Sequence, residues 1–194
     1  MERKMKKIST KTLVIGAALT AVVIVLQMLG AFIRFGMFQV SLVLAPIVIG
    51  AAIGGVGLGA WLGFVFGVVV LLNGDAAGFL AIDVFGTIVT VLLKGTLSGL
   101  AAALVYKALE KKNKYLAVIL AAIVCPVVNT GVFLLGCFTF FMEAIKEWAG
   151  GGDLVNYFIM GLGIINFPVE LLFNIILSPA ILRLLNIKEI KKVK

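Results

Sequence analysis

The 194-residue sequence contains no histidine, only two cysteines and only nine acidic residues. Without histidine, and with Cys125 and Cys137 alone in one apolar run, the chain lacks the ligand sets of zinc, haem and iron–sulfur sites. The two cysteines are about 18 Å apart along a helix, which is too far for a disulfide within that helix. We therefore expect no cofactor and interpret both thiols as packed side chains.

Motifs of catalysis are also missing from the sequence. No GxxxxGK[ST] loop is present, so the chain has no P-loop with which to bind ATP. No nucleophile–base set is evident either, and no histidine can relay a proton. These absences disfavour an enzyme and favour a binding or transport subunit.

Apolar residues dominate what remains. They make up 62% of the chain, and its mean hydropathy is +1.20. Ordinary globular domains are roughly 45–50% apolar, and here the apolar runs exceed the roughly 20 residues that cross a bilayer. The sequence therefore predicts an all-α integral membrane protein.

Glycine, charged residues and loop residues divide the chain into six apolar segments. The predicted spans are about 12–32, 40–54, 57–73, 84–107, 115–141 and 158–186. The second span is short and rich in glycine at its end. We expect one domain over residues 1–194, built as a bundle of six transmembrane helices.

The net charge of +8 is concentrated in three short clusters, MERKMKKISTK, YKALEKKNK and IKEIKKVK. Each cluster lies at the end of an apolar run, which is typical of cytoplasmic membrane loops rather than of nucleic-acid binding. Both termini and the 107–114 loop are therefore predicted to be cytoplasmic. The loops on the other side are mostly acidic, and the longest is predicted at 142–157.

Small residues recur at helical spacing in two predicted spans. Glycine stands at every fourth position in the third span, at Gly55, Gly59, Gly63 and Gly67, and Gly95 and Gly99 repeat the spacing in the fourth. Such a face allows another backbone to approach closely. We interpret these glycines as internal helix packing.

Three polar residues are predicted to lie near the middle of the bilayer. Counted from the outer helix ends at about 1.5 Å per residue, Lys94 lies roughly 13 Å deep, and Asn129 and Glu170 roughly 18 Å deep. Charged groups at this depth are costly and usually mark a functional site. We therefore expect Lys94, Asn129 and Glu170 to converge on a bound small molecule.

Further polar residues extend this predicted site. Thr87, Thr90 and Ser98 share a helical face with Lys94, and Asn166 and Asn174 share one with Glu170. Pro126 and Pro168 are expected to loosen their helices and expose backbone carbonyls. Near the outer helix ends, Arg34, Gln39, Asn73 and Asp75 either cover the site or are solvated. The candidate substrate-binding residues are Lys94, Asn129, Asn166, Glu170, Asn174, Thr90, Arg34 and Asn73.

Three other interpretations remain open on the residues alone. Lys94 and Glu170 can form a buried ion pair that only joins two helices. A stand-alone secondary carrier can use Glu170 as a proton site, because such carriers place a carboxylate at the midplane. A structural subunit without a ligand would leave the polar cluster unexplained.

The combined pattern resembles the substrate-binding subunit (S component) of an energy-coupling factor (ECF) transporter. The resemblance covers about residues 10–190. It is carried by the six short spans, by Ala17 and Ala21 behind a basic N-terminus, by SLVLAPIVIGAAIGGVGLGAWLGFVFGVVVLL and by the asparagine-bearing fifth span.

This resemblance implies a bacterial vitamin importer in the plasma membrane. It implies a subunit that binds its substrate from outside and docks on a transmembrane coupling subunit carried by two ABC-type ATPases. It also implies that Ala17 and Ala21 contact the coupling subunit, although the residues alone favour internal packing. With only Trp61 and Trp148, the chain lacks the tryptophan-rich site of thiamine-type members. Riboflavin-like and pantothenate-like substrates both remain open.

Overall fold

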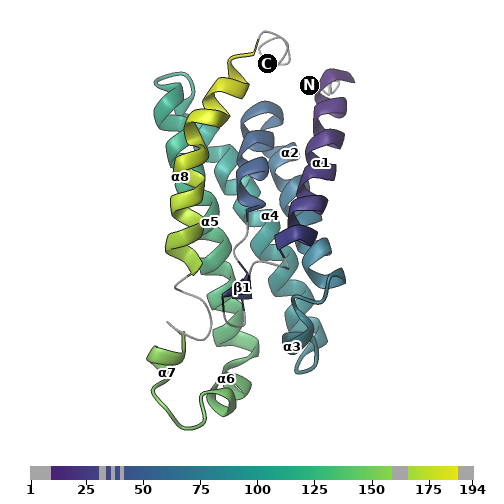
Figure 1. Ribbon diagram of the computed structural model, residues 1–194, viewed down its shortest axis with the longest axis vertical. Coiled ribbons are helices and arrows are strands. Elements are labelled where there is room, and N and C mark those ends of the chain that lie inside the picture. The colour runs from purple at the N-terminus through teal and green to yellow at the C-terminus, as the bar shows by residue number, and fades with distance from the viewer. Residues whose placement is uncertain (1–9, 31–33, 36–37, 40–41, 159–165, 188–194) are drawn as a thin grey trace, which may run out of the picture.

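The structure is a computed structural model that describes residues 10–30, 34–35, 38–39, 42–158 and 166–187 (Figure 1). Its elements are α1 (Thr10–Gly30), β1 (Arg34–Phe35), β2 (Phe38–Gln39), α2 (Leu44–Leu72), α3 (Ala77–Leu80), α4 (Val84–Leu109), α5 (Lys114–Phe140), α6 (Met142–Trp148), α7 (Leu154–Asn156) and α8 (Asn166–Leu185). Among the described residues, α1, α2, α4, α5 and Phe167–Leu185 of α8 are long and apolar enough to cross a membrane. The fold is therefore helical, with one two-residue antiparallel hairpin formed by β1 and β2.

Side-chain caps fix where two of the long helices begin. The carboxylate of Asp83 accepts a hydrogen bond from the Gly86 backbone N–H at 3.0 Å, which caps α4. The amide oxygen of Asn113 accepts from the backbone N–H groups of Tyr115 and Leu116, which caps α5. Such caps satisfy backbone donors that the first helical turn leaves without partners. Both helices begin within one residue of the predicted span.

A reversal at Gly55 divides α2 into two segments. Gly55 has φ 70° and ψ −155°, a conformation that glycine adopts without steric cost. In an unbroken helix Ala51 and Gly59 would be about 12 Å apart. Instead, a Cβ built on Gly59 would lie 3.1 Å from the Ala51 side chain, and Gly50 lies against Leu62. The chain therefore folds back at the predicted boundary between the second and third spans.

Glycine brings the second segment of α2 into backbone contact with α4. A Cβ built on Gly59 would lie 2.5 Å from the Gly99 carbonyl oxygen, and one built on Gly63 would overlap the Gly95 carbonyl. The predicted packing role of this glycine face is confirmed for both pairs. Gly55 is the exception, because it lies at the reversal with nothing within 4 Å of its Cβ position.

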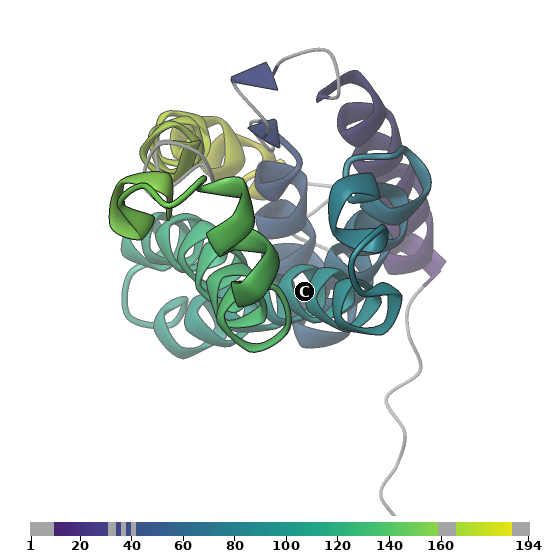
Figure 2. The same ribbon diagram turned by 90° about the horizontal axis from the view of Figure 1, so that it is seen from below.

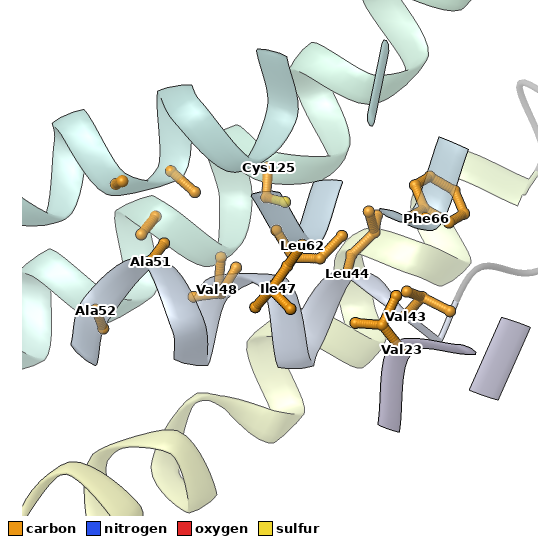
Figure 3. Close-up of a cluster of buried hydrophobic side chains, with 14 of the residues drawn as sticks. Val23, Val43, Leu44, Ile47, Val48, Ala51, Ala52, Leu62, Phe66 and Cys125 are labelled. Atoms are coloured by element: carbon orange, nitrogen blue, oxygen red, sulfur yellow. The ribbon is translucent and has the colours of Figure 1, made fainter. Parts of the chain in front are cut away.

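The helices are arranged around α2. It packs against α1, α4, α5 and α8, while α5 lies between α4 and α8. Figures 1 and 2 show α1 on the opposite side of the bundle from α5 and α8. In the core, Ile47 from the first segment of α2 meets Leu62 from the second and Cys125 from α5 (Figure 3). All three side chains are fully buried.

The two ends of the bundle differ in structure and charge. Helix α1 begins and α8 ends at the same end, whereas α3, α6 and α7 lie at the other end (Figure 1). The predicted 142–157 loop contains two short helices, α6 and α7. Phe141, just before it, and Ile145 and Trp148 within it follow helical spacing and pack in one cluster with Phe79. This packing stabilises helices that are too short to persist alone.

Candidate functional site

Helix α4 presents different residues to its two neighbours. Gly95 and Gly99 face α2, as described above. Thr90, Lys94 and Ser98 repeat every four residues and lie about a third of a turn away from those glycines. This second side of α4 is the one that approaches α5.

The contacts between α4 and α5 align the two helices in antiparallel register. A Cβ built on Gly136 would overlap the Thr90 side chain. One turn deeper, the Lys94 ammonium lies 5.2 Å from the centre of the Phe133 ring. Asn129 is one helical turn from Phe133, toward the start of α5. It therefore lies at about the same depth in the bundle as Lys94, or slightly nearer the end where α5 begins. The predicted convergence of spans four and five is therefore present in the fold.

Helix α8 carries a third polar series, Glu170, Asn174 and Ser178, spaced four residues apart. The Asn174 side-chain amide donates to the Glu170 backbone carbonyl at 2.9 Å, and the Ser178 hydroxyl donates to the Asn174 carbonyl at 2.9 Å. All three side chains are buried. Helix α8 begins partway along α5 rather than at its outer end (Figure 1).

The surroundings of Lys94 join the three helices. Its Nζ lies 5.7 Å from the centre of the Phe66 ring and 5.2 Å from that of Phe133, both within the range of a cation–π contact. The Glu170 carboxylate on α8 adds negative potential at this ammonium. The Lys94 side chain is half-buried, and that of Glu170 is buried. The bundle therefore holds two side chains of opposite charge, on α4 and on α8.

Three buried oxygens have no hydrogen-bond partner among the residues that the structure describes. They are Thr90 Oγ1, Asn129 Oδ1 and Asn174 Oδ1, from side chains only 4%, 5% and 2% exposed. Leaving a buried polar atom unsatisfied costs about 1–3 kcal/mol. We call Thr90, Lys94, Asn129, Glu170 and Asn174 the polar face. Its unsatisfied oxygens are suited to accept hydrogen bonds from a bound molecule.

A second polar group ties α1 to the outer end of α2. The Asp75 carboxylate accepts hydrogen bonds from the Gln27 amide at 2.8 Å and from the Asn73 amide at 2.5 Å. Asn73 and Asp75 were predicted near the outer helix ends, whereas Gln27 was not singled out. The available signal was a glutamine within Ala21–Gly30, where every other residue is apolar, and its side chain is 1% exposed.

Several predicted site features lie elsewhere or outside the described side chains. Asn166 is the first residue of α8 and Arg34 lies in β1, but their side chains fall outside the described residues, as does that of Gln39. Pro126 lies inside a continuous α5. The prediction that Pro168 loosens its helix is wrong, because Pro168 lies in the first turn of α8, where the missing N–H costs no helical hydrogen bond.

Sequence reasoning also missed an aromatic cluster beside the polar face. Phe79 meets Phe133, Phe141 and Trp148 edge-on, with ring centroids 5.7, 4.9 and 5.5 Å away. Phe133 thus contacts both this cluster and Lys94. No helical spacing in the sequence connects Phe79 with α5, so only the folded chain brings these rings together.

No group of side chains suited to hold a metal ion occurs among the described residues.

Comparisons with known proteins identify the family to which the chain belongs. A family model described as the substrate-specific component of ECF transporters matches residues 11–182. No curated protein and no solved structure matches the chain significantly. Because the match covers most of its length, the chain belongs to the family of ECF transporter substrate-specific components, and it is a multi-pass membrane protein with a transport role.

Proposed function

We propose that this substrate-specific component binds a water-soluble vitamin, riboflavin-like or pantothenate-like, at its polar face and delivers it across the bacterial plasma membrane. The observation that carries the proposal is the set of three buried, unsatisfied oxygens on α4, α5 and α8. A structural ion pair alone would not require them, and an apolar replacement at each position would be more stable. The presence of these three oxygens therefore favours a ligand-binding role for the polar face.

The substrate-binding set combines the polar face with residues nearer the outer end. Asn166 precedes Glu170 by four residues on α8, and Arg34 and Asn73 belong to segments at the outer side of the bundle. We propose that these three residues complete the site when substrate enters from outside. We propose that a separate module of one transmembrane coupling subunit and two ABC-type ATPases supplies the energy, which membership of the family supports.

We further propose that one domain of 1–194 crosses the membrane six times with both termini in the cytoplasm. The reversal at Gly55 supports the sixth crossing, since it makes two antiparallel segments of α2. Exposed lysines at positions 11, 107, 111, 112 and 114 support the orientation, since they gather at the ends of α1, α4 and α5 that share one side.

Cysteine labelling in intact cells tests this orientation. The native cysteines are buried, so an added exposed cysteine is the reactive one. Lys112→Cys should be labelled only from the cytoplasm, and Glu147→Cys only from outside. Labelling of both positions from the same side would contradict the six-span topology.

The interface with the coupling subunit is proposed at Ala17 and Ala21. Both residues are exposed on α1, on the side away from α2. Ala17→Trp or Ala21→Trp should leave ligand binding by the isolated protein intact and abolish transport, because a bulky ring prevents close helix approach. Val22→Trp, also exposed on α1 but at least about 100° from both alanines around the helix, serves as the control. Equal loss of binding and transport would place the two alanines in internal packing.

Purification of the tagged protein from its own membranes tests the proposed function most directly. Two ATPase subunits and a coupling subunit should accompany it, and native mass spectrometry should detect a bound small molecule. A stand-alone carrier that uses Glu170 as a proton site would instead purify without ATPases and transport under a proton gradient. That result would contradict the proposed function and support a stand-alone proton-coupled carrier.

A further inference from the structure

The Asp75 carboxylate is held by two amides at the outer end of the bundle. Its Oδ2 accepts hydrogen bonds from the Asn73 amide at 2.5 Å and from the Gln27 amide at 2.8 Å. The Asn73 amide oxygen in turn accepts from the Asp75 backbone N–H at 3.1 Å. The bonds with Asn73 stay within one turn of the chain, whereas the bond from Gln27 ties this turn to α1, 48 residues away in the sequence.

Backbone hydrogen bonds join the turn at Asp75 to the helices on either side of it. The Ala77 N–H donates to the Gly74 carbonyl at 3.1 Å, which leads the turn into α3. After α3, the Asp83 N–H donates to the Phe79 carbonyl at 3.0 Å, and Asp83 then caps α4. Because the segment is hydrogen-bonded along its length, a shift of Asp75 is carried to Phe79, four residues further along the chain.

Phe79 extends this connection to the polar face. Its ring meets the Phe133 ring edge-on, with centroids 5.7 Å apart. The Phe133 ring lies 5.2 Å from the Lys94 ammonium. Edge-on ring pairs and cation–π contacts both depend on how the rings are placed. The position of Phe79 therefore affects where the Phe133 ring lies beside Lys94.

We infer that Gln27 and Asp75 are positioning residues for the polar face, although neither belongs to it. Through Phe79, their hydrogen bond sets where the Phe133 ring lies against Lys94. Binding sites need such support, because side chains that touch a ligand must be held in place by the residues behind them. This inference rests on the proposed function and deepens it, because it assigns part of the ligand affinity to a hydrogen bond outside the polar face.

Trp148 offers a measurement that needs no ligand. The chain has two tryptophans, so Trp61→Phe leaves Trp148 as the single tryptophan, with its ring 5.5 Å from that of Phe79. In this background, Gln27→Met removes the donor to Asp75 and keeps a side chain of similar length. The acrylamide quenching constant of Trp148 should rise about twofold, because a loosened segment shields the indole less well.

Met28→Leu is the control for the quenching measurement, because Met28 is an exposed neighbour of Gln27 on α1. In the same Trp61→Phe background it should leave the quenching constant of Trp148 unchanged. An unchanged constant in Gln27→Met, or an equal rise in Met28→Leu, would overturn the inference.

Titration of the purified full-length protein with riboflavin and with pantothenate measures the effect on binding. For the vitamin that the wild type binds, Gln27→Met should lower the affinity about tenfold, mainly through faster dissociation. Gln27→Lys keeps an N–H donor for the Asp75 carboxylate and should stay within about threefold of the wild-type affinity.

Trp61→Phe removes a different hydrogen bond between α1 and α2, the one to the Thr20 hydroxyl, and should bind like the wild type. This control separates positioning from general loosening of α1. Unchanged affinity in Gln27→Met, or the same loss in Gln27→Lys or Trp61→Phe, would overturn the inference.

The outcomes for this inference and for the proposed function are separable. A loss of affinity confined to Gln27→Met, in a protein that purifies without an ECF module, would support the positioning role and refute the import function. Wild-type affinity in Gln27→Met, with an ECF module in the purified complex, would do the reverse. If neither vitamin binds, the proposed substrate classes are refuted, and the quenching of Trp148 decides the inference.

Discussion

The two sides of α4 follow opposite rules of packing. Toward α2, Gly95 and Gly99 leave no space, and the facing glycines bring backbone against backbone. Toward α5, Thr90 lies against Gly136 and Lys94 lies over the Phe133 ring, and the Thr90 hydroxyl oxygen has no partner among the described residues. In lipid, close backbone packing stabilises helix association, whereas unsatisfied polar atoms weaken it. One helix therefore holds the bundle together on one side and retains groups for a ligand on the other.

The largest expected effect comes from adding a methyl group to the glycine side. In Gly63→Ala the new Cβ would overlap the Gly95 carbonyl, and backbone cannot rotate away as a side chain can. Overpacking typically costs about 1–3 kcal/mol, and we expect the upper end of this range. Unfolding in mixed detergent micelles measures the change in free energy.

Gly57→Ala is the matched control for this prediction. Gly57 lies in the same segment of α2, is exposed and has nothing within 4 Å of its Cβ position. The same chemical change should there be neutral or stabilise by up to about 1 kcal/mol, from helix propensity. Similar losses in both variants would contradict the assigned role of the glycine face.

A smaller effect is expected at the hydrogen bonds between α1 and the outer end of α2. Gln27→Leu removes the amide that donates to the Asp75 carboxylate at 2.8 Å and puts an apolar side chain of similar size in its place. Hydrogen bonds to charged groups are worth about 1.5–3 kcal/mol, and the Asn73 amide still donates to Asp75. We therefore expect a loss of about 1.5 kcal/mol in the free energy of unfolding.

Met28→Leu, at an exposed neighbour on α1, should change the same free energy by much less. If the two variants were equally stable, Gln27 would have no role in joining α1 to α2.

The smallest effect is expected at Trp61, on the exposed side of the contact between α1 and α2. Its indole N–H donates to the Thr20 hydroxyl at 3.2 Å, and that hydroxyl donates to the Gly16 carbonyl at 2.8 Å. Trp61→Phe keeps an aromatic ring but loses the donor, which should cost about 0.5 kcal/mol. If the melting temperature of this variant were far below that of the wild type, the Trp61–Thr20 hydrogen bond would contribute more to stability than is expected of an exposed bond.

The sequence predicted the long helices well, because they depend on local patterns. The starts of α4 and α5 agree with the predicted spans within one residue, and in the structure Asp83 and Asn113 cap these helices. The sequence could not show that Gly55 reverses the chain rather than joining the glycine face. Spacing alone does not reveal a positive φ angle.

Tertiary contacts account for the remaining differences. Gln27 and Asp75 are separated by 48 residues, and no helical periodicity connects them. The short helix α6 exists because Phe141 and Ile145 pack in a cluster with Phe79, which also lies far away in the sequence. The identity of the vitamin depends on how donors and acceptors are arranged in space, which residue types alone do not determine.

The most direct test of the polar face as a ligand site is the double variant Lys94→Met/Glu170→Gln. Removing both charges together avoids leaving one of them buried and uncompensated. The measurement combines the melting temperature with the affinity for the molecule that purifies with the wild-type protein. We predict a folded protein, as stable as the wild type or more so, that binds at least about tenfold more weakly. Wild-type affinity in a well-folded double variant would contradict a ligand site at Lys94 and Glu170 and would leave these residues a role in helix packing alone.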